Sequence, residues 1–162
     1  MSRWRPPQKP ASAYITPTGY QSLETELDQL WKKRRIVNDA LAAAAAEGDR
    51  SENAEYQYRK KEQAGIDRRI RYLQKRMPEL TIVTQVASTA AVYFGAFVTV
   101  DIDGELSEYR VVGADETDLE KRWISIDSPL AQFLLKKTIG DGGTVSLGAK
   151  RAEVYVEAIR YE

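Results

Sequence analysis

The sequence predicts an α+β protein, in which an antiparallel coiled-coil hairpin of two helices precedes a small β-sheet domain with one short helix. Through residues 17–77 apolar side chains recur at spacings of three and four, which is the helical period. Beyond Met77-Pro78 the spacing changes to two, the period of strands, because proline ends the helical pattern. We therefore expect a flexible tail at 1–13, a hairpin domain at 14–79 and a sheet domain at 80–162.

The composition excludes several classes of chemistry. The 162 residues include neither cysteine nor histidine, which excludes disulfides, thiolate or imidazole metal sites, and Ser–His or Cys–His nucleophiles. Any metal ion must be held by oxygen atoms, which favours magnesium, manganese or calcium. The sequence has neither an apolar run long enough to span a membrane nor an apolar signal segment, so we expect a cytoplasmic protein with no membrane partner.

The net charge of zero conceals a segregated pattern, although the chain holds 24 basic and 24 acidic residues. Residues 47–55, here called the tip, carry four acids and one arginine. Residues 59–76 carry eight basic residues against two acids, and residues 77–162 carry fourteen acids against eight bases. This arrangement suggests a partner that has a charge pattern of its own.

The two helices of the predicted hairpin can be read from their ends and seams. Thr16-Pro17 is typical of a helix start, with a hydroxyl N-cap before proline at the first helical position. Gly48 is typical of the residue that follows a helix end. A second helix starts at the tip, and so short a connection requires the helices to run antiparallel. Arg34 interrupts the first seam, while Arg59 and Gln63 occupy weaker positions of the second. The seams consist of Leu23, Leu27, Leu30, Val37, Leu41 and Ala44, then Tyr56, Ile66, Ile70, Leu73 and Met77.

The remainder of the chain has the pattern of a small sheet. Asp103-Gly104 is a strong signal for a two-residue hairpin turn. In the last predicted strand Val154, Val156 and Ala158 fall on one face. Strands are predicted at Thr81–Val86, Phe97–Ile102, Leu106–Val112, Arg122–Ile126, Thr144–Leu147 and Glu153–Tyr161, with a short helix at Leu130–Lys137.

The tip contains the most informative pair of residues, Asp49 and Glu52. On a helical start their spacing of three places both on one face, with Cβ atoms roughly 5–6 Å apart. Two carboxylates at that separation can share one magnesium ion, but they supply only part of an octahedral site, so a partner must complete it. The alternative is a capping box, in which an Asp N-cap and a Glu three residues later only start a helix. From spacing alone the capping box is the favoured interpretation, because capping boxes are far more common than half-sites for metal. Capping requires neither Glu47 nor Glu55, which shifts the balance slightly towards the metal hypothesis.

Two further stretches allow both a functional and a structural interpretation. The basic stretch, here called the flank, is either a phosphate-binding stripe or an ordinary solvated helix face. The sequence Asp127-Ser128-Pro129 is typical of an ordinary N-cap that opens a helix. The flank consists of Arg59, Lys60, Lys61, Arg68, Arg69, Arg71, Lys75 and Arg76.

These stretches together resemble the Gre transcript-cleavage factors of bacterial RNA polymerase, and the GreB branch most closely. The resemblance extends from about Tyr14 to Tyr161. It is most specific in residues 48–58 (GDRSENAEYQY), 66–69 (IDRR) and 94–96 (FGA). Residues 123–129 (WISIDSP) also match, although the family more often opens that stretch with tyrosine.

The resemblance implies a fold and an activity. It implies a coiled-coil hairpin that enters the secondary channel of a backtracked polymerase, followed by an FKBP-like domain. It also implies that the protein is not itself an enzyme but stimulates cleavage of the nascent RNA by the polymerase. In this role Asp49 and Glu52 help to hold a second Mg²⁺ shared with the polymerase active site, and Glu55 is a supporting acid.

The resemblance assigns roles to the remaining stretches as well. The flank would guide the 3′ end of the nascent RNA, while Asp127, Ser128 and Pro129 would dock on the largest polymerase subunit. We expect a monomer that binds no metal stably on its own. Glu62 and Ala64 stand where basic residues are expected, and the N-terminal tail is longer than usual. The alternatives are a channel-binding inhibitor that does not stimulate cleavage, and a structural or chaperone-like module.

Overall fold

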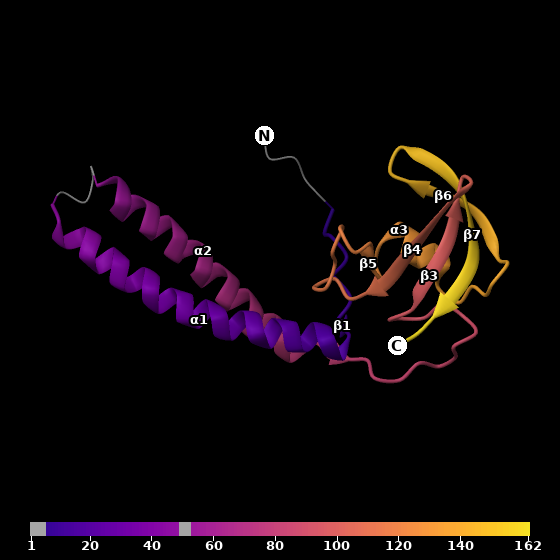
Figure 1. Cartoon of the computed structure of the whole chain (residues 1–162), viewed down its shortest axis with the longest axis horizontal. Helices are drawn as coiled ribbons and strands as arrows, with labels where there is room; N and C mark the ends of the chain where they lie inside the picture. Colours follow the sequence, from indigo (N-terminus) through magenta and orange to yellow (C-terminus); the bar gives the residue numbers. More distant parts are fainter. Residues whose placement is uncertain (1–5, 49–52) are drawn as a thin grey trace. The chain divides into compact units, whose positions relative to one another are not determined.

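The structure is a computed structural model that describes residues 6–48 and 53–162. The chain divides into two compact units (Figure 1), one formed by Thr18–Leu80 and the other by Met1–Pro17 together with Thr81–Glu162. A pair of helices comes first, and a mixed sheet with one short helix follows. The predicted α+β class is therefore confirmed.

The first unit is a hairpin of two long helices. Helix α1 covers Pro17–Ala46 and begins at the predicted proline, while α2 covers Ala54–Arg76 and continues into a short 3-10 helix at Met77–Glu79. The helices lie side by side and antiparallel (Figure 1). The buried side chains described in this unit all belong to the predicted seams, and they are Leu23, Val37, Ala44, Ile66, Ile70, Leu73 and Met77.

Polar pairs cross the hairpin at the positions that interrupt its seams. Nε of Arg34 donates to Asp67 at 2.7 Å, and the Gln63 amide donates to Asn38. Half-exposed pairs of this kind contribute only about 0.5–1 kcal/mol each to stability. Their main effect is on register, because a shift of either helix would leave each polar group without its partner.

The second unit is built on a five-stranded sheet with the order β5-β4-β3-β7-β6. All neighbouring strands are antiparallel except β4 and β5, which are parallel. Helix α3 (Pro129–Leu134) contributes Leu130, Ala131 and Leu134 to the core on one face of the sheet. The strands are β3 (Phe97–Ile102), β4 (Glu105–Val112), β5 (Trp123–Ser125), β6 (Gly142–Leu147) and β7 (Lys150–Arg160).

The sheet unit departs from the prediction in three places. The predicted strand Thr81–Val86 is only two residues long, because its partner β1 (Tyr14–Ile15), which was not predicted, offers β2 (Thr81–Ile82) two residues to pair with. The predicted short helix ends early, at Leu134. Ala158 does not share the buried face of Val154 and Val156, because the register of β7 against β3 shifts between Val156 and Ala158.

A buried carboxylate fixes the segment that leads into α1. Glu116 accepts hydrogen bonds from the N–H of Gly113 at 2.8 Å, from the N–H of Thr16 at 3.1 Å and from the Thr16 hydroxyl. Gly113 is needed there, since a Cβ atom at this position would lie 2.0 Å from the carbonyl oxygen of Tyr14. These contacts hold β1 against the sheet unit.

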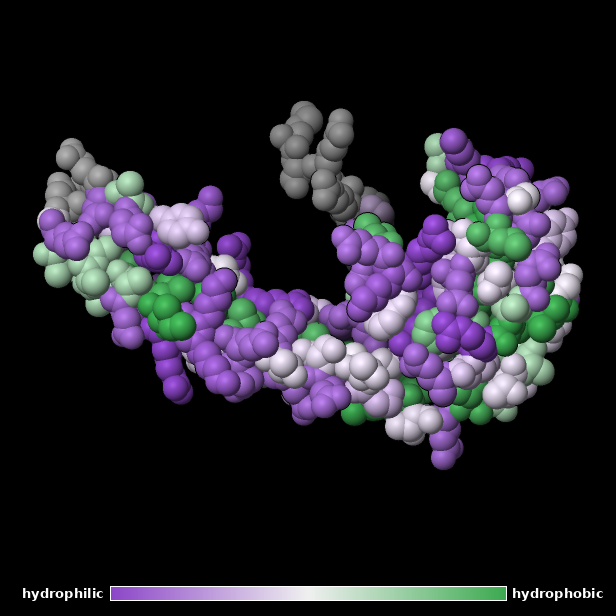
Figure 2. All heavy atoms as spheres, in the orientation of Figure 1, coloured by the Kyte–Doolittle hydropathy of each residue, from purple (hydrophilic) through white to green (hydrophobic). Residues whose placement is uncertain are grey.

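The face of the hairpin that is visible in Figure 2 is largely hydrophilic. A weakly hydrophobic area near the end of α1 corresponds to the exposed alanines Ala42, Ala43 and Ala46. Among the described residues, none of the helices is both long enough and apolar enough to cross a membrane.

Candidate functional site

Well-defined helix ends flank the tip. Its two central acids, Asp49 and Glu52, lie outside the described residues. Helix α1 ends at Ala46, and Gly48 has a φ of 145°, in the region that favours glycine. Helix α2 begins at Ala54. The segment that holds the predicted metal-binding pair is therefore a connection between two helices.

Asn53 caps both helices at this connection. Its side-chain oxygen accepts a hydrogen bond from the N–H of Tyr56 at 3.0 Å, which makes Asn53 the N-cap of α2. Its amide nitrogen donates to the carbonyl oxygen of Ala44 at 2.7 Å, in the last turn of α1. One side chain thus satisfies a free N–H group of one helix and donates to a terminal carbonyl of the other, which also accepts a longer hydrogen bond from the N–H of Glu47 at 3.3 Å.

This geometry corrects two expectations for the tip. The capping-box interpretation required Asp49 to be an N-cap, but Asn53 fills that position. The spacing argument placed Asp49 and Glu52 on the first turn of a helix, whereas α2 starts after both of them. Asn53 belongs to the matching stretch at 48–58, but we predicted no role for it. The signal was available, because asparagine is among the most favourable N-cap residues.

Glu55 lies in the first turn of α2 and is engaged by a cation. Its carboxylate accepts a hydrogen bond from Nε of Arg59 at 2.8 Å, and Nη1 of Arg59 donates to Glu62 at 3.0 Å. The hydrogen bond to Glu55, and next the one to Glu62, raise the pKa of Arg59 above its ordinary value. Arg59 therefore remains charged and holds Glu55 beside the helix. Glu62 stands where a basic residue was expected, and it joins this pair instead.

The donor chemistry of the tip suits a hard cation. Its acids offer carboxylate oxygens, which magnesium prefers. Within residues 6–48 and 53–162, no group of three or more acidic, cysteine or histidine side chains could hold a metal ion. The predicted metal-binding pair, Asp49 and Glu52, lies outside these ranges.

The predicted flank separates into two sets of cations. The paired set consists of Arg59, Arg69 and Arg76, which are half-buried. Nε and Nη2 of Arg69 donate to the two oxygens of Glu26 at 2.6 and 3.0 Å, and Nη1 of Arg76 lies 3.9 Å from Glu79. Arg69 joins the two helices, whereas Arg59 and Arg76 pair with acids of their own segment. All three are therefore poorly placed to receive a ligand.

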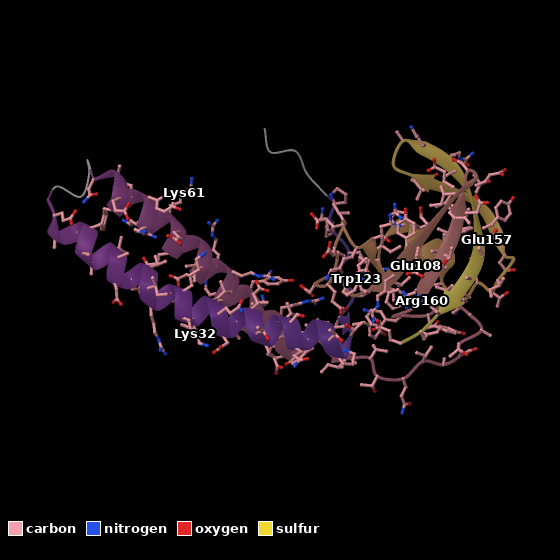
Figure 3. The ribbon with its side chains drawn as sticks, viewed as in Figure 1. Lys32, Lys61, Glu108, Trp123, Glu157 and Arg160 are labelled. Carbon is pink, nitrogen blue, oxygen red and sulfur yellow. The ribbon has the colours of Figure 1, made fainter. Side chains whose placement is uncertain are left out.

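The second set of cations is exposed on α2 and is here called the outer set. It consists of Lys60, Lys61, Arg68, Arg71 and Lys75. Lys61 projects from α2 away from α1 (Figure 3). A shallow depression of about 310 Å³ on this face includes Ala64, the other departure from the expected basic pattern. Its other lining residues are Lys60, Gln63, Asp67, Arg68 and Arg71. The outer set offers side chains that could follow a phosphate backbone.

The loop predicted to dock has a clear structural role for two of its three residues. The Ser128 side chain accepts a hydrogen bond from the N–H of Ala131 at 3.3 Å, and Pro129 occupies the first position of α3. The interpretation of these residues as an ordinary N-cap is therefore confirmed. Asp127 is exposed and makes no cap.

An apolar recess of about 310 Å³ adjoins this loop, and Ile126 forms part of its wall. The aromatic rings of Tyr14 and Phe94 in the same wall lie 5.9 Å apart at 54°. The other lining residues are Val83, Gln85, Val86, Ala87, Tyr93, Leu135 and Lys136. The loop thus combines an exposed carboxylate that α3 does not use as a cap with a neighbouring apolar surface, a combination suited to protein contact.

Comparison with known proteins defines the class to which this fold and site belong. The family model "Transcription elongation factor, N-terminal" matches residues 13–82, and the model "Transcription elongation factor, GreA/GreB, C-term" matches residues 87–161. The class is therefore that of the transcription elongation factors.

Individual relatives narrow this assignment to one branch. The transcription elongation factor GreB of Xanthomonas axonopodis pv. citri is 54% identical, over 99% of this chain and 98% of that protein. GreB of Pseudomonas aeruginosa is 48% identical, again over 99% and 98%. The chain belongs to the GreA/GreB family, in its GreB branch. Among solved structures, Gfh1 of Thermus thermophilus matches with a TM-score of 0.44 and 23% identity, covering 92% of this chain and 99% of that one.

We predict that Asn53→Ala destabilises the hairpin by about 1–2 kcal/mol, because it removes an N-cap and the shorter of the two hydrogen bonds that the Ala44 carbonyl accepts. Asn53→Asp is the matched control, since aspartate keeps the cap but cannot donate to Ala44. It should cost less than Asn53→Ala. Urea denaturation followed by helical circular dichroism measures both. Equal stability of the alanine variant and the unmodified protein would contradict the double-cap interpretation.

Proposed function

We propose that this protein inserts its hairpin into the secondary channel of bacterial RNA polymerase and stimulates cleavage of backtracked nascent RNA. The observation that carries the proposal is the acidic tip between two helices that Asn53 joins, in a chain of the GreB branch. A stiff hairpin about 40 Å long, at about 1.5 Å per residue, is suited to deliver carboxylates to a recessed active site. The polymerase would remain the enzyme.

In this proposal Asp49 and Glu52 would hold a magnesium ion together with groups of the polymerase active site. That ion would supply activation of water and stabilisation of charge in phosphodiester cleavage. The protein's own contribution is to place two ionised carboxylates and to keep their connection short. Asn53 performs the second task by joining α1 to α2 on either side of the pair.

Glu55 would support the pair through its charge. Because Arg59 holds its carboxylate at 2.8 Å, we assign Glu55 a positioning role and do not count it as a direct ligand. Arg59, itself held by Glu62, also limits the repulsion between Glu55 and the other acids of the tip.

The outer set on α2 would contact phosphates of the RNA 3′ segment. Its five cations are exposed, whereas the paired set is occupied by acids of the hairpin. Glu62 and Ala64 stand where basic residues were expected, so the flank has fewer cations than the family pattern. Neither of them interrupts the outer set. At the other end of the chain, Asp127 and the apolar recess beside Ile126 would dock on the largest polymerase subunit.

We predict that Asp49→Asn with Glu52→Gln lowers the rate of RNA cleavage by about 10- to 100-fold, because two metal-binding charges are lost. Polymerase binding should not change. The measurement is cleavage of one defined backtracked elongation complex at fixed magnesium concentration. The matched control, Glu24→Gln with Asp39→Asn, removes two exposed acids from α1 and should cleave normally.

Two outcomes would decide against the proposal. Full cleavage by the tip variant would exclude the metal-binding role of Asp49 and Glu52. Slower nucleotide addition without any cleavage, at saturating unmodified protein, would favour a channel-binding inhibitor instead.

We predict that Arg68→Gln with Arg71→Gln weakens cleavage of long backtracked RNAs several-fold and makes it less sensitive to salt. Each lost phosphate contact to a single strand reduces the slope of log affinity against log salt by about 0.7. Lys32→Gln with Arg35→Gln removes the same charge from α1 and is the control, because Lys32 projects on the other side of the hairpin (Figure 3). Equal effects of the two pairs would show that only net charge matters.

A further inference from the structure

Asp127, the exposed carboxylate of the docking loop (Asp127-Ser128-Pro129), already has a hydrogen-bond partner within the chain. The N–H of Ser12 donates to Oδ2 of Asp127 at 2.8 Å, and the Ser12 hydroxyl donates to Oδ1 at 2.5 Å. Both oxygens of Asp127 are thus engaged by the N-terminal tail. Hydrogen bonds to an ionised carboxylate are stronger than those between neutral groups. This contact therefore holds residue 12 against the loop.

The tail continues along the same loop beyond this contact. Residues 9–12 are here called the strap. A recess next to Asp127 is shared between the strap and the sheet unit, and its lining residues are Lys9, Pro10, Ala11, Ala114, Ser125, Asp127 and Gln132. The strap consequently lies beside the one residue of the docking loop that α3 does not use as a cap.

The chain immediately after the strap is fixed. The carbonyl of Ala13 accepts a hydrogen bond from Thr81 at 2.7 Å, and the carbonyl of Ile15 accepts one from Val83 at 2.9 Å. Ser12 is therefore tethered one residue from an ordered strand. Its effective concentration at Asp127 is high, and little conformational entropy is lost when the two meet.

We propose that the strap masks the docking surface, so that Asp127 becomes available only when residues 9–12 lift away. The partner surface that this loop fits presents hydrogen-bond donors, such as an arginine or lysine, to the two oxygens that Ser12 now occupies. Partner and strap compete for the same atoms. This inference rests on the proposed docking role of Asp127.

The competition sets the size of the effect. The apparent dissociation constant equals the intrinsic constant divided by the unmasked fraction. Two charge-assisted hydrogen bonds at an exposed site stabilise the masked state, and the entropy lost when the strap becomes ordered opposes them. We therefore expect the strap to cover Asp127 in about 70–90% of molecules. Removing the strap should then strengthen binding about 3- to 10-fold.

Binding of labelled protein to RNA polymerase, measured by fluorescence anisotropy, tests this inference. Deletion of residues 2–12 keeps Ala13 and β1 and should lower the dissociation constant about 3- to 10-fold. Deletion of residues 2–8 is the matched control, because it shortens the tail but keeps the strap, and it should bind as the full chain does. In an Asp127→Ala background, deletion of 2–12 should bring no gain.

A single substitution in the full chain tests the same contact independently of whether the deletion variants fold. Ser12→Ala removes the hydroxyl donor but keeps the N–H group, and it should strengthen binding about 2-fold. Ser22→Ala, on the exposed side of α1, is its control and should change nothing. Equal affinity of the full chain, the 2–12 deletion and Ser12→Ala would overturn the mask and leave the docking proposal intact.

The remaining outcomes are also decisive. Weaker binding after deletion of 2–12 would overturn the mask and assign the strap to the docking surface itself. A gain that persists in the Asp127→Ala background would overturn the competition for Asp127. Failure of every variant, the full chain included, to bind polymerase would overturn the docking proposal, and the mask with it.

Discussion

The side chain of Asn53 is the contact on which the functional end of the hairpin depends. Two helices that merely lie side by side leave their ends free to fray, because the last carbonyls of one and the first N–H groups of the other have no partners. Asn53 satisfies one group of each kind. The connection that carries Asp49 and Glu52 is thereby limited to the few residues between Gly48 and Asn53. Like charges crowded into so short a segment repel one another, so the joint must be firm for them to be presented together.

The cations of α2 show how one charge run serves two purposes. Arg59, Arg69 and Arg76 pair with acids of the hairpin, and the cost of desolvating them is offset by those acids. The outer set is exposed and can exchange its hydration for a ligand. Because the helix turns by about 100° per residue, neighbours such as Arg68 and Arg69 are directed differently. The same run of residues therefore stabilises the hairpin and remains available to a polyanion.

The sequence predicted most of the fold, because its signals were local. Heptad spacing, Pro17 at a helix start and Asp103-Gly104 in a turn each depend on residues close together in the chain. The prediction was wrong where the length or register of a strand depends on a partner strand that is distant in the sequence. Thr81–Val86 is shortened because β1 offers only two residues, and Ala158 changes face at an irregularity opposite β3. A register shift of this kind leaves no local signal.

The site could be predicted only in part, for a related reason. Asp49 and Glu52 have the spacing of a capping box, and the structure shows that Asn53 is the cap instead. The sequence prediction treated the flank as one stripe of cations, because a count of charges does not show that Glu26 of α1 pairs with Arg69 of α2. The contact between Ser12 and Asp127 joins residues 115 positions apart and has no local signature. The roles of the tip, the outer set and the docking loop stay predictions.

The central proposal is that Asp49 and Glu52 of the tip help to hold a magnesium ion at the polymerase active site. The most direct measurement is the magnesium concentration that gives half-maximal cleavage of a backtracked complex, with and without saturating protein. The account predicts that the unmodified protein lowers this concentration, and that Asp49→Asn with Glu52→Gln restores the higher value. An identical magnesium dependence in the presence of the unmodified protein and of the tip variant would contradict it.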